Sequence, residues 1–442
     1  MSGREGLMKM MGVLLFCLAG PVFAGQVLDG GKTERVGNLP IPAIEDLLRV
    51  DRKIRPSREA MRNSAFVLKT SSHPVTGERY VILTDHTSTG CLAALDRLAM
   101  VRKGVVLRVK DLALIHRRPE RMEQLRDQLR QSRVRYLAVA PRLESFRENM
   151  VLGIWELAST LDDDPQLDLF PGFLVASDEK RFVSLVERSI NHRPTRNKAL
   201  RPVAISQVRT AGELRSLQKA AVLRKLFVRS SISMPIVAIY GARAKNAATL
   251  SGTGIWNLRA NPGERFLKQF PPSAARALEE ASLIVMHGHG APGMSCGVDV
   301  AGLPKSLNGK FVLTGSCFAA SPVRSDLPSL RQAPGGYRVE ARDAFALRAI
   351  DQGATAVFGH MRLSMGFPHL FPVLESWMKG QTLGESYQQL INGLIEIYGF
   401  RSGRFVVPAD VPSGRRLPQN RLLYVVFGDP ALQPFEPLVK RR

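Results

Sequence analysis

The sequence predicts an α/β fold in which a mostly parallel sheet is covered by helices. Short apolar runs alternate with helix-length amphipathic segments over most of the chain, and this alternation is typical of parallel strands joined by crossover helices. Several of the apolar runs have no polar residue at their centre, as in strands that are buried on both faces. A chain of 442 residues is long enough to form two large subdomains.

The amino terminus, residues 1–24, has the features of a signal peptide. Arg4 and Lys9 supply positive charge, residues 11–18 are mostly apolar, and residues 22–24 resemble a cleavage site. An amino-terminal membrane anchor is the alternative, but the apolar run is shorter than the ~20 residues that span a bilayer. We therefore expect an exported protein that works in the periplasm, on the cell surface or outside the cell.

The rest of the chain divides into three regions by composition. Residues 25–65 are polar and contain prolines, so we expect an extended amino-terminal segment or a short pro-region there. Residues 66–232 and 233–437 both show the alternating pattern, which predicts an amino-terminal α/β subdomain followed by a carboxyl-terminal, catalytic one. The polar run at residues 230–233 marks the boundary between them.

The first subdomain is predicted to alternate between strand and helix. Asp178 precedes an apolar stripe of helical spacing and is a suitable helix cap. Residues 191–208 are basic, and we expect them to be irregular. The predicted strands are 80–84, 105–109, 136–140 and 173–176, and the predicted helices are 92–103, 120–131, 182–190 and 211–227.

The second subdomain repeats this pattern, and the chain contains no tandem repeat of fixed period. Its last strand is expected to close the sheet. The predicted strands are 235–240, 282–286, 310–314, 354–358 and 422–427, and the predicted helices are 272–280 and 341–352, with two more before the last strand.

The chain is strongly basic, with a formal net charge of +23. Apolar residues make up 45% and charged residues 23% of the composition, which is ordinary for a globular protein. The basic residues are scattered, and no nucleic-acid-binding motif accompanies them. We therefore expect contact with an anionic envelope surface rather than with nucleic acid.

Two apolar runs of the second subdomain end in residues that can carry chemistry. Residues 282–286 lead into His-Gly-His-Gly at 287–290, and residues 310–314 lead into Gly-Ser-Cys at 315–317. Open α/β sheets bind their ligands at the carboxyl ends of the strands. The connection that follows the histidine motif, residues 291–309, has 19 residues, enough for a parallel crossover. We therefore expect a histidine and a cysteine to meet at one edge of the sheet.

A histidine beside a cysteine is the arrangement that a thiol nucleophile needs. The thiolate is the reactive form, whereas an ordinary thiol with a pKa of about 8.5 is mostly protonated at neutral pH. His289 can take the proton of Cys317 and later give it to a leaving amine. Gly290 lets the backbone approach a substrate, so the N–H groups of Gly290 and Cys317 are candidates for an oxyanion hole.

A zinc site is the main alternative for these residues. His287 and His289 form an H-x-H pair, to which Cys317 could add a third ligand. No Asp or Glu follows within the next several residues, and the glycines suit a close backbone approach better than a rigid ligand set. We therefore expect no metal at this site.

The histidine, the cysteine and the chain that follows them carry several short motifs in a fixed order. They are Gly288-His289-Gly290, Ser316-Cys317, Gly353-Ala354, Leu383-Gly384-Glu385 and Gly428-Asp429-Pro430. This order resembles that of the gingipain-like cysteine peptidases of the caspase-like clan, over about residues 78–435. The resemblance implies two caspase- or gingipain-like subdomains and an endopeptidase that forms a thioester on Cys317. It also implies that His289 is the general base and acid and that His287 is a packing residue.

The resemblance leaves the third catalytic residue open. Some family members carry a carboxylate after the first strand of the second subdomain, where this chain has Tyr-Gly-Ala-Arg at 240–243. Ser316 and His360 are candidates for the substrate pocket. Three carboxylates could each select a basic side chain of the substrate; they are Asp299, Asp326 and Asp343.

Two questions of ligation and redox state remain open at the sequence level. Residues 162–164 are all Asp and could bind the structural calcium that some relatives use, with a solvated acidic turn as the alternative. No other cofactor is expected. A disulfide between Cys91 and Cys296 would leave Cys317 as a thiol, whereas the alternative is three reduced cysteines.

The expected activity is the hydrolysis of peptide bonds in a protein or peptide substrate. A sortase-like transpeptidase, in which an amine resolves the acyl-enzyme, is the nearest alternative. A non-catalytic envelope binding protein that kept the fold is the alternative from another class. The sequence does not distinguish among cleavage-site preferences.

Overall fold

A computed structural model defines the positions of most residues after the amino-terminal region. The predicted signal peptide and most of the predicted pro-region lie outside the described residues. These are 34–36, 39–41, 79–110, 112–162, 164, 166–210, 215–244, 247–259, 267, 269–299, 302–321, 341–362, 364, 367–398 and 423–438.

Within the described residues, 11 strands form one continuous sheet, in the order β4-β3-β5-β6-β16-β15-β14-β10-β7-β8-β9. The strands of this sheet are β3 (Arg79–Thr84), β4 (Val105–Arg108), β5 (Val134–Ala140), β6 (Phe170–Phe173), β7 (Pro202–Val208), β8 (Ile236–Tyr240), β9 (Ile255–Arg259), β10 (Leu283–His287), β14 (Phe311–Thr314), β15 (Ala356–His360) and β16 (Tyr424–Phe427).

The strands of this sheet run in two groups of opposite direction. Neighbouring strands are parallel from β4 to β16, and again from β15 to β9. Among the described strands of this sheet, β15 and β16 form the one antiparallel pair. This confirms the predicted α/β class and its mostly parallel sheet, and we call the two groups the first half and the second half.

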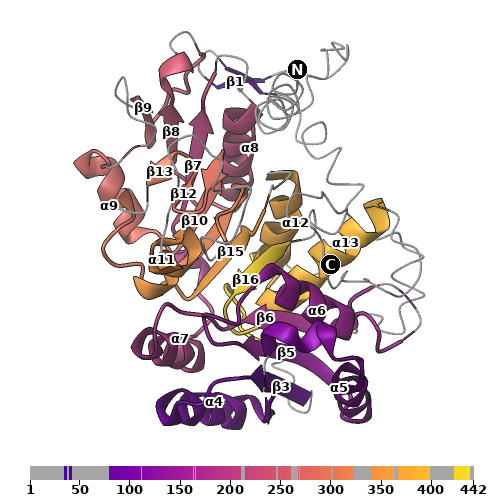
Figure 1. Ribbon diagram of the computed structural model, residues 1–442. Coiled ribbons are helices and arrows are strands. Elements are labelled where there is room, and N and C mark those ends of the chain that lie inside the picture. Colours follow the sequence, from indigo (N-terminus) through magenta and orange to yellow (C-terminus); the bar gives the residue numbers. More distant parts are fainter. Residues whose placement is uncertain are drawn as a thin grey trace, which may run out of the picture.

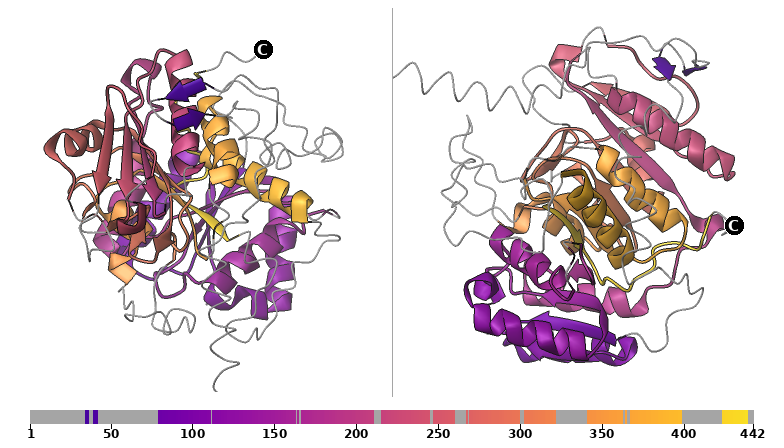
Figure 2. Two further views of the ribbon diagram at one scale, coloured as in Figure 1. Left: turned by 90° about the horizontal axis from the view of Figure 1, so that it is seen from above. Right: turned by 90° about the vertical axis from the view of Figure 1, so that its right-hand side faces the viewer.

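Helices cover both faces of the sheet (Figure 1; two further views in Figure 2). In Figure 1, α4, α7, α11 and α9 lie on one side, and α5, α6, α13, α12 and α8 on the other. None of the described helices combines the length and apolarity needed to cross a membrane. The helices are α4 (Thr89–Arg102), α5 (Pro119–Gln131), α6 (Glu148–Ala158), α7 (Glu179–Asn191), α8 (Arg215–Arg229), α9 (Pro272–Glu280), α11 (Phe345–Asp351), α12 (Phe367–Met378) and α13 (Leu383–Tyr398).

Two small antiparallel sheets complete the described elements. One pairs β1 (Glu34–Val36) with β2 (Leu39–Ile41), and Figure 1 shows β1 near α8. The other joins β11 (Gly290–Ala291), β12 (Met294–Ser295) and β13 (Val298–Asp299) directly after β10. The sequence did not predict this second sheet, although it follows the candidate histidine.

The predicted start of α7 is confirmed, since the Asp178 side chain accepts a hydrogen bond from the Arg181 N–H at 2.9 Å. The prediction that residues 191–208 are irregular is wrong, because β7 occupies their last seven positions. This strand lies between β10 and β8, so it belongs to the second half, although the boundary at residues 230–233 assigned it to the first subdomain. Its polar Ser206 and Gln207 interrupt the apolar run and concealed the strand.

An ion pair to a buried carboxylate fixes the end of β16 within the first half. The Asp429 carboxylate accepts hydrogen bonds from the Tyr80 hydroxyl at 2.8 Å and from Arg102 Nε and Nη2 at 2.9 and 2.6 Å. The Asp429 side chain has no exposed area. Burial, followed by the Asp429 charge, raises the pKa of Tyr80 well above its ordinary value. Asp429 is thus a structural residue that fixes β16 to β3 and α4.

Replacement of this carboxylate should destabilise the fold. Asp429→Asn leaves Arg102 without its buried partner, so we expect the free energy of unfolding to fall by about 3 kcal/mol. Chemical denaturation followed by circular dichroism measures this loss. The control is Glu187→Gln, which removes an ion pair to Arg97 whose side chains are 38% and 50% exposed, and should cost less than about 1 kcal/mol. Equal losses in the two variants would contradict the assignment.

Candidate active site

The candidate histidine and cysteine follow two strands that lie side by side in parallel. Met286 at the end of β10 is in register with Thr314 at the end of β14. His289 and Cys317 each lie three residues beyond this last pair, so both chains leave the sheet at the same edge and advance by the same number of residues. The structure therefore brings the two predicted segments to one site, and both residues are partly exposed there.

Gly290 packs directly against the main chain of Cys317. A methyl group at position 290 would lie 2.2 Å from the carbonyl oxygen of Cys317, 3.1 Å from its nitrogen and 2.6 Å from Ser316 Cβ. The backbone could not approach this closely with any side chain at position 290. The absence of a side chain at Gly290 thus sets the distance between the histidine segment and the cysteine segment.

The histidine segment is held by β7 and by the hairpin of β12 and β13, which follows the histidine in the sequence. The His289 N–H donates to Gln207 Oε1 at 3.0 Å, and the His289 carbonyl accepts from the Cys296 N–H at 2.8 Å. Cys296 and Gly297 connect β12 to β13 with positive φ angles of 56° and 74°, as in a type I′ hairpin turn. Gln207 was not among the predicted site residues, since a glutamine in a basic segment gives no signal.

A network of hydroxyl groups supports the cysteine segment. Ser316 Oγ accepts from the Cys296 N–H and from Ser295 Oγ, both at 3.0 Å, and Ser295 Oγ is 2.7 Å from Thr314 Oγ1. Thr314 Oγ1 also accepts from the Ser316 N–H at 3.1 Å. Ser316 is fully buried, so this predicted pocket residue has a structural role beneath the site.

The residue after the cysteine has an unusual conformation. Phe318 has a positive φ of 59°, which costs a non-glycine residue about 1–3 kcal/mol and persists only where the surrounding structure imposes it. Its N–H donates to the Arg362 carbonyl at 2.8 Å, and the Ala320 N–H donates to the His360 carbonyl at 3.1 Å. Cys317 Sγ lies 3.9 Å from the Ser364 carbonyl oxygen. The segment after β15 therefore fixes the turn that presents the cysteine.

His360, the other predicted pocket residue, is also fully buried. Its Nδ1 accepts from the Arg362 N–H at 2.9 Å, and its ring packs edge-on against Tyr424 with centroids 4.5 Å apart. Of the carboxylates considered for specificity, Asp299 and Asp343 are partly exposed and Asp326 lies outside the described residues.

The three cysteines of the described chain form no disulfide. Cys91 is buried in α4, and the buried Cys296 thiol donates to the carbonyls of Ile205 and His287 at 3.2 and 3.0 Å. Burial raises the pKa of both thiols above the ordinary value. The structure thus matches the reduced alternative, and Cys317 is the one partly exposed cysteine among the described residues.

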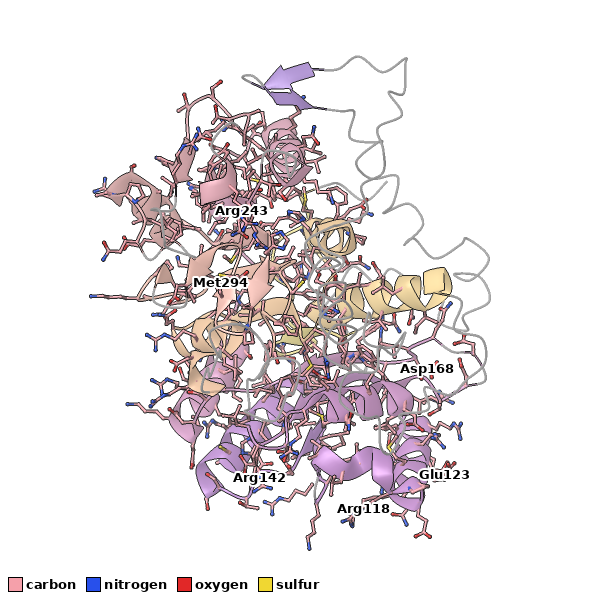
Figure 3. All side chains as sticks on the ribbon, turned by 45° about the horizontal axis from the view of Figure 1, so that its top comes forward. Arg118, Glu123, Arg142, Asp168, Arg243 and Met294 are labelled. Atoms are coloured by element: carbon pink, nitrogen blue, oxygen red, sulfur yellow. The ribbon has the colours of Figure 1, made fainter. Side chains whose placement is uncertain are left out.

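In the described part of the chain, a single group of metal-binding side chains converges. Oxygens of Asp162, Asp164 and Asp168 lie within 4.8 Å of one another, whereas His287, His289 and Cys317 form no such group. Figure 3 shows Asp168 far from Met294, which lies on the hairpin beside the site. Main-chain N–H groups already donate to all three carboxylates, at 2.7 to 3.0 Å. The zinc alternative at His287, His289 and Cys317 and the calcium considered at residues 162–164 both stay predictions.

The site can support nucleophilic chemistry on a carbonyl compound. It combines a thiol and an imidazole on segments of matched length with glycine at the closest backbone contact. The side chains of Gln207 and Ser316 accept hydrogen bonds from the main chain of His289 and Cys296, and Ser295 Oγ donates to Ser316 Oγ, so both segments are fixed. Such pre-organisation is what general acid–base catalysis and an oxyanion hole require.

No protein-family profile and no curated protein matches the chain. Among solved structures, it is similar to Saccharomyces cerevisiae separase in its complex with securin, with a TM-score of 0.37 and 11% identity over 68% of this chain. The match spans 16% of the separase chain.

A second match is the spinosyn rhamnosyltransferase SpnG complexed with thymidine diphosphate. Its TM-score is 0.12 at 11% identity, over 47% of this chain and 74% of that chain. Likenesses this low carry no conclusion about family or activity.

Because Gly290 contacts the cysteine segment so closely, a single methyl group added at position 290 should change the reactivity of Cys317. In Gly290→Ala, the new Cβ must displace the Cys317 carbonyl, so we expect the rate of Cys317 alkylation by iodoacetamide to change at least about fivefold. Mass spectrometry of the labelled peptide measures this rate. The control is Gly241→Ala at the end of β8, whose Cβ would meet its nearest neighbour at an ordinary 3.4 Å. Unchanged labelling in Gly290→Ala would show that the contact is not close.

The acidic cluster predicts a pH-dependent stability. Burial and the neighbouring Asp162 charge raise the pKa of Asp168 to about 8, far above the unfolded value of about 3.9. The folded protein therefore retains a proton that the unfolded chain loses, and the stability from this group falls as the pH rises from about 4 to about 8. Relative to Asp168→Asn, the wild type should lose on the order of a few kcal/mol across this window. Denaturation at several pH values measures the difference, and a constant difference would contradict the prediction.

Proposed function

We propose that this protein is a cysteine-type endopeptidase, with Cys317 as the nucleophile and His289 as the general base and acid. The observation that carries the proposal is the equal extension of the two segments beyond the register pair Met286 and Thr314, with Gly290 against the Cys317 backbone. The partial exposure of both candidate residues, and the hydrogen bonds from their segments to Gln207 and Ser316, agree with this role.

The proposed reaction has two steps. In the first, Cys317 Sγ attacks the carbonyl carbon of the peptide bond while His289 takes the thiol proton and gives it to the leaving amine. The carbon–nitrogen bond breaks and a thioester forms on Cys317. In the second, water adds to the thioester carbon with His289 as base, and the carboxylic acid leaves as Sγ is released.

The oxyanion that forms in both steps needs hydrogen-bond donors. The N–H groups of Gly290 and Cys317 are our candidates, because their backbones lie in van der Waals contact. Donors that are fixed before the reaction are each worth about 2.7–4 kcal/mol of transition-state stabilisation. The fixed conformation of Phe318 maintains the position of the Cys317 N–H in this scheme.

The environment of the reaction is part of the proposal. The charge of +23 suits an anionic envelope surface, and the signal-like residues 1–24 suit export. Protein or peptide substrates outside the cytoplasm are therefore the class we propose, and no cofactor takes part in the scheme.

Removal of the thiol tests the nucleophile. Cys317→Ala should abolish cleavage of a peptide library and labelling by a peptidyl acyloxymethyl ketone, while the circular dichroism spectrum stays that of the wild type. The control is Cys91→Ala, which removes a buried thiol from the first half and should leave turnover intact. Cleavage that persists in Cys317→Ala, or a wild type that binds peptides without cleaving them, would reject the proposal.

Removal of the imidazole tests the base. His289→Ala should reduce kcat/KM by about 10²–10⁴-fold, the usual contribution of a positioned general acid–base. His287→Ala should have a much smaller effect, since this side chain ends β10 within the sheet. Steady-state kinetics on one fluorogenic peptide compares the two variants, and the reverse order of effects would assign the base to His287.

Product analysis separates hydrolysis from transpeptidation. With an added amine nucleophile, a hydrolase should still release mainly the free acid, whereas a sortase-like transpeptidase should transfer the acyl group to the amine. Mass spectrometry of the products distinguishes the two, and mainly amide product would replace the hydrolase proposal by its transpeptidase variant.

A further inference from the structure

An ion pair connects the first half to the segment that holds the candidate nucleophile. Arg362 Nε lies 2.7 Å from both carboxylate oxygens of Glu148, and Arg362 Nη2 lies 2.6 Å from Glu148 Oε2. The side chains are 24% and 15% exposed. Glu148 is the first residue of α6, 214 positions away in the sequence. Partly buried, multiple Arg–carboxylate contacts of this kind are geometrically specific.

The backbone of Arg362 is the direct support of the turn after Cys317. Its carbonyl accepts the Phe318 N–H at 2.8 Å, and its own N–H donates to His360 Nδ1 at 2.9 Å. Two residues further on, the Ser364 carbonyl oxygen lies 3.9 Å from Cys317 Sγ. Movement of this segment would therefore move the acceptor that keeps Phe318 in its positive-φ conformation, and with it the thiol.

Helix α6, which carries Glu148, is itself fixed by buried hydrogen bonds. Halfway along it, Trp155 Nε1 donates to the Tyr387 hydroxyl at 2.9 Å, and that hydroxyl donates to the Tyr424 carbonyl at 2.6 Å. Trp155 and Tyr387 are fully buried. The Ser364 hydroxyl lies 2.9 Å from the Tyr424 hydroxyl. The helix that carries Glu148 and the segment that follows β15 are therefore both attached to β16.

We propose that Glu148 is a positioning residue for Cys317. Through its ion pair with Arg362 it holds the segment after β15, which in turn fixes Phe318 and the orientation of the thiol. The first half of the chain thus contributes to the site without touching the substrate. The effect on turnover rests on the proposed peptidase function, whereas the effect on the thiol itself does not.

The test compares Glu148→Gln with wild type in two assays on the full chain. The first is the rate at which iodoacetamide alkylates Cys317, followed by mass spectrometry. The second is the separation of kcat from KM on a fluorogenic peptide. We expect the alkylation rate of Cys317 to change about tenfold. We also expect kcat to fall about tenfold or more while KM changes by less than about twofold, because a displaced thiol is misaligned with the substrate carbonyl but does not weaken substrate binding.

The matched control is Arg135→Gln. It removes an ion pair between β5 and α13, from Arg135 to Glu385, that has similar exposure, with both side chains 16% exposed. This variant should lose a comparable amount of thermal stability yet alkylate and turn over as the wild type does. A Glu148→Gln protein that behaves in both assays as Arg135→Gln does would overturn the proposal.

A double-variant comparison tests whether Glu148 acts through Arg362. If it does, Arg362→Gln and the double variant should show the same fold-changes as Glu148→Gln, because all three lose one interaction. Multiplied effects in the double variant would contradict the pathway. Should Glu148→Gln not fold, Arg362→Lys keeps the charge but cannot form the same contacts, and the same expectations apply to it.

The two proposals fail separately. If the wild type cleaves no peptide, the peptidase proposal fails, while a Cys317 alkylation rate that changes in Glu148→Gln but not in Arg135→Gln still supports the positioning role. If peptides are cleaved and Glu148→Gln matches the control, the peptidase proposal stands and the positioning role is rejected.

Discussion

The parallel register of β10 with β14 is the constraint on which the site depends. Both strands are buried apart from the end of β10, and a shift by one residue would turn every side chain of the shifted strand to the opposite face of the sheet. The register places Met286 opposite Thr314 and therefore makes the two segments that follow equally long. The glycine at position 290 then allows the two backbones to touch. Burial in the sheet, rather than any interaction at the surface, aligns the histidine with the cysteine.

The sequence predicts the strands well where all their residues are buried, and it does not predict contacts between residues that are far apart in the chain. β10, β14 and β15 have nearly continuous apolar runs and were predicted close to their observed positions. β7 was missed because Ser206 and Gln207 look like loop residues, yet Gln207 faces the histidine segment and binds its backbone. Neither the positive φ of Phe318 nor the pairing of Glu148 with Arg362 leaves any local pattern, so neither could be predicted.

The two halves are more closely integrated than the predicted division into subdomains suggested. They share one sheet across the antiparallel pair β15–β16, and buried polar contacts fix β16 at both of its ends. Asp429 binds Tyr80 and Arg102 at one end of β16, while Tyr424 at its other end receives the Tyr387 hydroxyl. Changes in the first half can therefore reach the site through the packing of the junction.

The central claim is that His289 and Cys317 act together on a peptide carbonyl. The most direct measurement is a crystal structure of the wild type after reaction with a peptidyl acyloxymethyl ketone. The account predicts a covalent bond from the inhibitor to Cys317 Sγ, with the His289 imidazole within hydrogen-bond reach of the adduct, about 3 Å. An unreacted Cys317, or an adduct from which the His289 ring is remote, would contradict it.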